Sequence, residues 1–291
     1  MWTIDPPKSP DVLVARITLP HAGDKQWIML SGDRHHDSLN ADWKLEKRHL
    51  DKAKERDAMI LDVGDLFDVM QGRSDRRARK GAIRPELQGR DDYFDAVVDM
   101  AEDFYGPYAG QFAVLALGNH EDSIIHHGEL NLTAHLARRL RGVARENGTE
   151  HTGPRAMGYS GWVQFLIKAT SKASRLDLYY HHGSGGAAPV TRGTIKANRR
   201  ATWIDSDFVF TGHIHDQWIL RQKRIGLTQR GVPMERTQYH IQTPSYKRLG
   251  DWERRMEMAP RHRGCIWLSL EAVGGVVANT RVKVDFEEDL E

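Results

Sequence analysis

Five short clusters of Asp, Asn and His, each with a glycine beside them, are the part of this sequence that could do chemistry. They are SGDRHHD (31–37), DVGDLFD (62–68), LGNHED (117–122), YHHGSGG (180–186) and TGHIHD (211–216). Carboxylate, imidazole and amide oxygen ligands without a thiolate suit cations such as Mn, Fe or Zn, and not a thiolate-rich structural zinc site. The residue types therefore indicate a metal-binding site.

The spacing within two clusters supports the same chemistry. Asp33 and His35 are two residues apart, and so are His213 and His215. On an extended strand this spacing places both side chains on one face, about 6 to 7 Å apart. Each pair could supply two ligands to one metal, or one ligand to each of two neighbouring metals. A single pair would be weak evidence, because most such pairs are incidental, but five clusters at strand ends are hard to explain by chance.

Each cluster follows a short apolar run that predicts a β-strand. The predicted strands cover residues 26–31, 58–63, 112–117, 176–180 and 207–211, and the predicted helices cover 41–56, 91–105, 123–141 and 191–203. In an open α/β sheet, ligands bind beyond the carboxyl ends of the strands, so side chains from all five clusters can converge there. We expect one domain over residues 1–291, with the motifs in 26–216 and a strand-rich segment in 217–291.

Composition limits the partners and the compartment. The net charge of the 291-residue chain is only +2, but basic residues are concentrated in 71–90 and 221–263. Such patches suit an anionic partner, such as a phosphate ester or nucleic acid, and solvated loops are the alternative. Cys265 is the only cysteine, which excludes an intramolecular disulfide. Without a signal peptide or an apolar run long enough to span a membrane, a cytoplasmic protein with no membrane partner is expected.

In order and content, the five clusters resemble the motifs of the calcineurin-like metallophosphoesterase superfamily. Those motifs are Asp-x-His, Gly-Asp-x-x-Asp, Gly-Asn-His-Asp/Glu, a His before Gly, and Gly-His-x-His, and all occur here between residues 33 and 215. The resemblance implies an α/β fold, a four-layer αββα sandwich of two mixed sheets flanked by helices, whose second sheet residues 217–291 would complete. The stretch HHGSGGAAPVTRGTIKANRRA is similar to members carried by phages and prophages.

The resemblance also implies two divalent metal ions, Mn in the first place, with Fe, Zn, Ni or Co as alternatives. One ion would be held by Asp33, His35, Asp65 and His215, and the other by Asp65, Asn119, His182 and His213. In the fourth cluster His182 is preferred to His181, because it directly precedes Gly183. A hydroxide that bridges the metals would attack phosphorus. His120 would protonate the leaving group, and Asp68 would orient His120.

Further residues are candidates for contacting the substrate. Arg34 lies between two proposed ligands, and His181 adjoins another. Three basic residues of the predicted helix 191–203 share one face at i, i+4 and i+7: Arg192, Lys196 and Arg199. The basic loop 73–84 could serve in the same way, and ordinary surface charge is the alternative for all of these.

Three functions follow as hypotheses. The first is a metal-dependent phosphodiesterase that acts on nucleic acid or nucleotides, including the possibility of a nuclease. The second is a phosphomonoesterase that acts on a nucleotide, a sugar phosphate or a phosphoprotein. The third is a non-catalytic protein that keeps the fold as a scaffold. The third is disfavoured, because every implied metal ligand and His120 are present.

Overall fold

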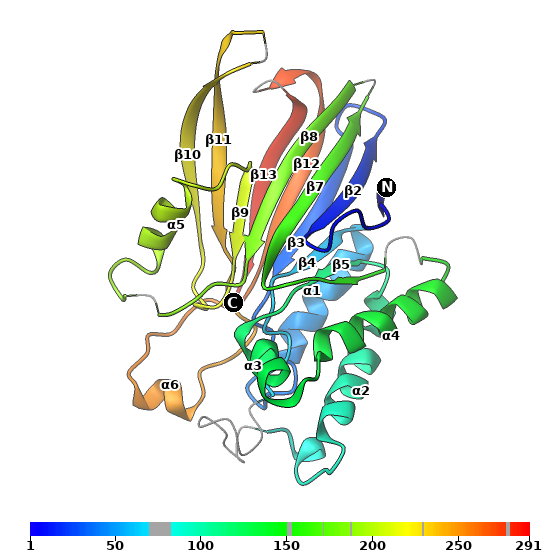
Figure 1. Ribbon diagram of the computed structural model, residues 1–291, viewed down its shortest axis with the longest axis vertical. Helices are drawn as coiled ribbons and strands as arrows, with labels where there is room; N and C mark the ends of the chain where they lie inside the picture. Colours follow the sequence, from blue (N-terminus) through cyan, green and yellow to red (C-terminus); the bar gives the residue numbers. More distant parts are fainter. Residues whose placement is uncertain (70–82, 150–152, 171, 187, 229, 278–279) are drawn as a thin grey trace.

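Two mixed β-sheets form the centre of the molecule (Figure 1). The computed structural model describes residues 1–291 except 70–82, 150–152, 171, 187, 229 and 278–279. The first sheet contains, in spatial order, β1 (Trp2–Ile4), β2 (Val12–Leu19), β7 (Ser160–Ala169), β8 (Lys172–His181), β9 (Phe208–Thr211), β11 (Pro233–Gln242) and β10 (Trp218–Leu227). The second contains β13 (Thr280–Leu290), β12 (Gly264–Val277), β3 (Lys25–Ser31), β4 (Met59–Asp62), β5 (Phe112–Leu115) and β6 (Arg155–Ala156).

The two sheets pack face to face because each presents an apolar surface to the other. Along β2 and β7 buried residues alternate with more exposed ones, as expected for strands with one face in the core. Leu13 and Phe165 of the first sheet share a core with Ile28 and Leu61 of the second. Removing these side chains from water is the main force that holds the sheets together.

Helices cover the other face of the second sheet. The helices α1 (Trp43–Glu55), α2 (Tyr93–Tyr105) and α4 (Leu132–Glu146) lie together there (Figure 1). Their residues Leu50, Val97 and Leu136 share a second core with Ile60 and Phe112 of the sheet. The chain is therefore an α/β sandwich with two mixed sheets.

The resemblance implies a layer of helices on the outer face of each sheet, and the layer on the first sheet is much smaller than the layer on the second. Among the described residues, the helix beside the first sheet is the short α5 (Thr194–Arg200). It is tied to β10 by a 2.9 Å hydrogen bond that Gln222 donates to Asn198. The remaining helices, α3 (Asn119–Gly128) and α6 (Asp251–Arg255), and the 3-10 turns η2 (Pro85–Leu87) and η3 (Gly106–Tyr108), lie in connections between the elements.

Most predicted elements agree with the structure to within a few residues, but two predictions are wrong. The helix expected at 123–141 is two helices, because α3 begins at Asn119 and the chain turns at Glu129, whose φ is 55°. Residues 217–291 do not complete one sheet. They supply β10 and β11 to the first sheet and β12 and β13 to the second. Alternating apolar residues identify strands but do not say which sheet they join.

Parallel pairing brings the ends of the cluster-bearing strands together. In the second sheet β3, β4 and β5 are mutually parallel, and in the first sheet β8 is parallel to β9. The carboxyl ends of each set therefore lie at one edge of its sheet. The site described below is built from the loops at these ends.

His240 of β11 should make the stability of the protein depend on pH. Its side chain is buried, and burial together with Arg200 of α5 and Arg224 of β10 lowers the pKa of His240 to about 4. An unfolded histidine titrates near pH 6.5, so between pH 6.5 and 4 the unfolded chain binds the extra proton. We expect the contribution of His240 to stability to be complete above pH 6.5. It should be lost at up to about 1.4 kcal/mol per pH unit as the pH falls to about 4.

The measurement is urea unfolding of the protein and of His240→Gln across this pH range. The variant should lose less stability on acidification, since Gln does not titrate. Equal slopes for both proteins would show that His240 can be protonated in the folded state without cost.

Candidate metal centre

The candidate ligands lie on loops just beyond the strand ends. Asp33 and His35 follow β3, Asp65 follows β4, and Asn119 is the first residue of α3 after β5. From the other sheet, His182 follows β8 and the pair His213 and His215 follows β9. The site therefore lies where loops from both sheets meet.

Five of the seven candidate ligands adopt left-handed backbone conformations, which are uncommon for residues other than glycine. Their φ angles lie between 47° and 74°, at Asp33, His35, Asp65, His213 and His215. Such conformations cost about 1 to 3 kcal/mol each and cluster at functional sites. Both i, i+2 pairs lie beyond the strand ends, as the predicted strand bounds imply, so the face-sharing geometry of an extended strand does not apply to them. The loops, and not a strand face, aim these side chains.

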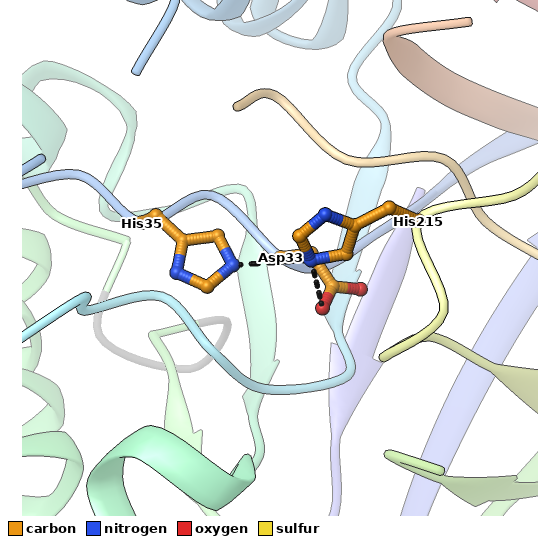
Figure 2. Close-up of side chains that lie close together, drawn as sticks. All are labelled: Asp33, His35 and His215. Carbon is orange, nitrogen blue, oxygen red and sulfur yellow. Dashed lines mark hydrogen bonds and ion pairs between the residues drawn. The ribbon is translucent and has the colours of Figure 1, made fainter. Parts of the chain in front are cut away.

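The first group of potential ligand atoms comes from Asp33, His35 and His215 (Figure 2). Nε2 of His35 faces Nε2 of His215 at 3.2 Å, and the latter atom lies 3.3 Å from Oδ1 of Asp33. Asp33 and His35 are buried, while the His215 side chain keeps 28 % of its surface exposed. The group is thus open to solvent on the side of His215.

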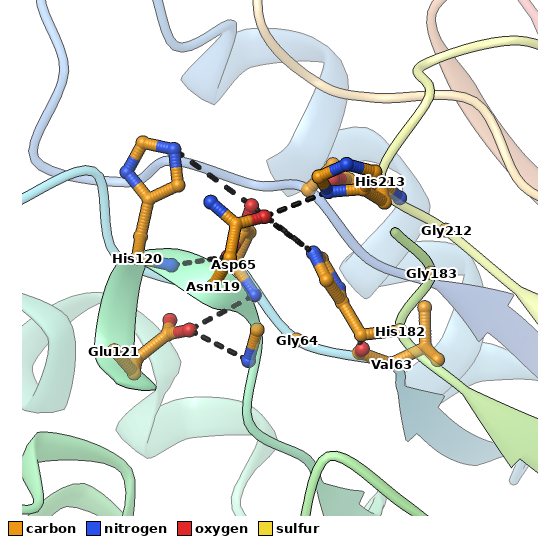
Figure 3. Close-up of polar contacts among 12 residues, drawn as sticks. Val63, Gly64, Asp65, Asn119, His120, Glu121, His182, Gly183, Gly212 and His213 are labelled. Carbon is orange, nitrogen blue, oxygen red and sulfur yellow. Dashed lines mark hydrogen bonds and ion pairs between the residues drawn. The ribbon is translucent and has the colours of Figure 1, made fainter. Parts of the chain in front are cut away.

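The second group comes from Asp65, His182 and His213, and Asn119 lies among them (Figure 3). Nε2 of His182 is 3.2 Å from Oδ2 of Asp65 and also 3.2 Å from Oδ1 of Asn119. Nδ1 of His213 lies 2.7 Å from the same amide oxygen. These side chains come from three loops and from the first residue of α3, and each turns its ligand atom inward.

The two groups are adjacent. His213 and His215 are separated only by Ile214, and the backbone N–H of His213 donates to Oδ2 of Asp33 at 2.8 Å. Asp65 belongs to the second group, and its role as a bridge between two metals stays a prediction. Of the two histidines in the fourth cluster, the structure places His182 in the group. It turns His181 away, where Nδ1 accepts a hydrogen bond from Gly183 N–H.

The charges of these buried groups fit a cation. Among the described residues, Oδ1 of Asp33 is buried without a hydrogen-bond partner, and a buried oxygen of this kind is costly unless positive charge compensates it. Burial lowers the pKa of His182, but the carboxylates of Asp65 and Asp33 outweigh this and raise the pKa to about 10. These carboxylates therefore attract positive charge, and a bound cation would displace the proton of His182. Burial lowers the pKa of His35 to about 4, which keeps it neutral as a metal ligand must be. Buried Asp and His residues in this arrangement could hold a metal ion.

His120 forms a third group of potential ligand atoms with His35 and Asp68, but Asp68 does not orient it in the way predicted. Nδ1 of His120 is 2.6 Å from the backbone carbonyl oxygen of Asp68, whereas the Asp68 carboxylate is 3.9 Å from that nitrogen. The carboxylate instead accepts a 2.8 Å hydrogen bond from Lys247 and lies 2.9 Å from Nδ1 of His35. Asp68 therefore holds His120 through its backbone and approaches a candidate ligand with its side chain.

Glu121 has a structural role that the sequence did not reveal. Its buried carboxylate accepts hydrogen bonds from the backbone N–H groups of Asp65 (3.1 Å), Phe67 (2.8 Å) and Gly118 (2.9 Å). Figure 3 shows Glu121 beside Asp65 and Asn119. It thereby ties the loop after β4 to the start of α3. Gly118 must be glycine because a Cβ atom there would collide with the Asp65 carboxylate.

Arg34 does not face a substrate, so this prediction is wrong. Its side chain is completely buried and forms ion pairs of 2.6 Å with Glu46 of α1 and 2.5 Å with Asp62 of β4. A third bond goes to Oγ of Ser31. The left-handed backbone at Asp33 and His35 turns the side chain between them away from the site. Arg34 thus connects the first ligand loop to the strand that carries the second.

The proposed basic face of helix 191–203 is also wrong in part. Arg192 precedes α5 and forms an ion pair with Asp216, and the Lys196 ammonium donates to the carbonyl oxygens of Ser184 and Gly186. Arg199 is on α5 and exposed. The basic loop 73–84 lies outside the described residues up to position 82, and Arg84 stacks on Trp43.

Residues after the last motif also build the site, which sequence reasoning missed. Oγ of Ser245 donates to the carbonyl oxygen of Asp33 at 2.7 Å, and Lys247 binds Asp68 as described above. No spacing or composition signal marks these residues, because they reach the site only through the return of the chain from β11. A cavity of about 360 Å³ lies here, and His215 forms part of its wall. A second cavity, of about 470 Å³, lies beside α2 and has none of the candidate ligands in its wall.

In the described part of the chain, no helix is both long enough and apolar enough to cross a membrane. No protein-family model matches the sequence, and no curated protein is significantly similar to it. Among solved structures, that of GAP50, the anchor in the inner membrane complex of Plasmodium, aligns with a TM-score of 0.44 and 12 % identity. The alignment covers 90 % of this chain and 84 % of that one. A similarity at this level carries no conclusion about function.

Proposed function

We propose that the protein is a metal-dependent phosphoesterase with the metallophosphoesterase fold, and that it hydrolyses phosphodiesters. The observation that supports this most directly is the pair of adjacent ligand groups, Asp33–His35–His215 and Asp65–His182–His213, with Asn119 beside the second. When bound, two divalent cations lower the pKa of water and stabilise negative charge on phosphate oxygens. We propose two Mn²⁺ ions as the metal pair to be tested first.

In this proposal His120 supplies the proton for the leaving group. Its Nδ1 nitrogen donates to the carbonyl oxygen of Asp68, which leaves Nε2 facing the second ligand group, 3.8 Å from Oδ2 of Asp65. Burial lowers the pKa of His120, but the carboxylates of Asp65 and Asp68 outweigh it and raise the pKa. His120 can therefore hold a proton at Nε2 and pass it to the leaving oxygen.

A substrate panel with Mn²⁺-loaded protein tests the proposal. We expect turnover of bis(p-nitrophenyl) phosphate, a diester, to exceed that of p-nitrophenyl phosphate, a monoester. The reverse order would favour the phosphomonoesterase alternative. Failure to bind metal in elemental analysis, together with no turnover of either ester, would favour the scaffold alternative.

His120→Ala should retain its metal but lose most of its activity. We expect turnover to fall by about 10² to 10⁴-fold, the usual contribution of a positioned general acid. The loss should be larger for an alkyl ester than for a p-nitrophenyl ester, because p-nitrophenolate leaves readily without a proton. Metal analysis and kinetics with both esters provide the measurement.

The matched control is His126→Ala, since His126 lies on the same helix with its side chain 76 % exposed. This control should behave like the unmodified protein. Loss of metal from His120→Ala, or an equal loss of rate for both leaving groups, would remove His120 from the role of general acid.

A further inference from the structure

The cavity beside His215 is strongly basic. Its wall is formed by the segment after β11, by α6 and by the chain that leads into β12. Only two carboxylates, Glu253 and Glu291, line it among the described residues, against five cations: Lys247, Arg248, Arg254, Arg261 and Arg263. We call this cavity the 247–263 cleft.

Three of the five cations are already paired with carboxylates. Arg248 and Arg263 both donate to the buried carboxylate of Asp42, and Lys247 donates to Asp68. The other two form no ion pair in the described part of the chain, although Arg261 lies close enough to the Asp216 carboxylate to help lower the pKa of Asp216. Arg261 donates to the carbonyl oxygen of Ile214, and Arg254 is exposed without a carboxylate partner. The cleft therefore has positive charge available for an anion from outside the protein.

The cleft is continuous with the candidate metal centre. His215 lines the cleft and also faces Asp33 and His35 of the first ligand group. The carbonyl oxygen that Arg261 contacts belongs to Ile214, between the candidate ligands His213 and His215. An anion in the cleft would thus lie beside a phosphate held at the metal centre. Both anionic groups could belong to one extended ligand.

We propose that the 247–263 cleft binds the phosphate next to the scissile one, and that the substrate is an oligonucleotide strand. This inference rests on the proposed phosphodiesterase function. A single diester has one phosphate, which the metal centre would hold. Arg254 and Arg261 could then bind a second phosphate of the same substrate. A nucleic-acid strand supplies phosphates at every nucleotide, and arginine is well suited to bind them. A volume of about 360 Å³ is within the range of sites for small ligands, so one nucleotide unit fits.

Kinetics of Arg254→Gln and Arg261→Gln with Mn²⁺-loaded protein test this inference. The substrates are p-nitrophenyl thymidine 5′-phosphate, with one phosphate, and a short thymidine oligonucleotide. We expect kcat/KM for the oligonucleotide, relative to the single-phosphate ester, to fall about tenfold in each variant. The slope of log kcat/KM for the oligonucleotide against log salt should become shallower by about 0.7 per lost contact. Arg138→Gln, an exposed arginine on α4, is the control and should change neither value.

The possible outcomes separate the inference from the proposed function. If the unmodified protein hydrolyses neither substrate, the proposed function fails. A second outcome is that the unmodified protein hydrolyses both substrates while the variants keep its ratio of kcat/KM values for the two substrates and its dependence of kcat/KM on salt. In that case the cleft does not bind a second phosphate. Because Arg261 also contacts the ligand loop, Arg254→Gln decides the matter if Arg261→Gln misfolds. A dinucleoside polyphosphate is assayed as a third substrate. If the variants lost kcat/KM for this compound and not for the oligonucleotide, the assignment to a nucleic-acid strand would be overturned.

Discussion

Asp65→Asn is expected to lose bound metal and at least about a thousandfold in turnover. The substitution keeps the shape of the side chain but removes its charge, and Oδ2 of Asp65 faces His182 at 3.2 Å in the second ligand group. A catalytic metal ion contributes several kcal/mol to transition-state stabilisation, and each 1.36 kcal/mol corresponds to a factor of ten. On the proposed function, loss of the Asp65 charge should therefore weaken both metal binding and catalysis.

Elemental analysis after dialysis, together with bis(p-nitrophenyl) phosphate hydrolysis, measures both effects. Thermal unfolding with and without Mn²⁺ gives an independent readout, because a ligand that binds only the folded state raises the Tm. We expect Mn²⁺ to raise the Tm of the unmodified protein and to leave that of Asp65→Asn nearly unchanged. Asp122→Asn, on the partly exposed side of α3, should respond like the unmodified protein. A variant at Asp65 with full metal content and full activity would refute the assignment of the centre.

Arg34→Met is expected to destabilise the protein by about 3 to 5 kcal/mol. The substitution leaves the carboxylates of Glu46 and Asp62 buried without the guanidinium that pairs with both. Breaking a buried ion pair by removing one partner costs this much, because the remaining charge is neither solvated nor compensated. Burial raises the pKa of Asp62 to about 6 even with Arg34 present, which shows how poorly this position accommodates charge.

Urea unfolding compares this variant with Arg16→Met, which removes an ion pair with Asp5 on the surface. The Arg16 side chain is 57 % exposed, so its loss should change the free energy of unfolding little. The experiment also decides between two roles for Arg34. A residue that only contacted the substrate would raise KM when replaced and leave the free energy of unfolding unchanged, and that result would contradict the structural role described here.

The ligand clusters and their strands could be predicted from the sequence because local signals encode them. Apolar runs that end in Gly, Asp, Asn and His mark the ends of β3, β4, β5, β8 and β9. The residues that converge in the two ligand groups are the residues whose types and order suggested metal binding. Residue types are written directly in the sequence, and a buried apolar strand has a short periodic pattern.

The directions of side chains could not be predicted in the same way. Arg34 stands between two residues of the site, yet the left-handed backbone on either side turns it into the core. Asp68 directs its carboxylate to Lys247 and His35, and only its backbone oxygen reaches His120. These directions depend on backbone and side-chain torsion angles, which local sequence patterns do not specify at residues other than glycine and proline.

The sequence by itself therefore determined the chemical types at the site and the strands that carry them. The tertiary structure alone decided which partners each side chain meets. Glu121 holds two loops together, and Lys247 and the 247–263 cleft come from a segment that begins more than twenty residues after the last motif. Such contacts depend on which sheet β10 to β13 join. The sheet that each strand joins depends on how whole apolar faces pack, and these faces are formed by residues distant in the sequence.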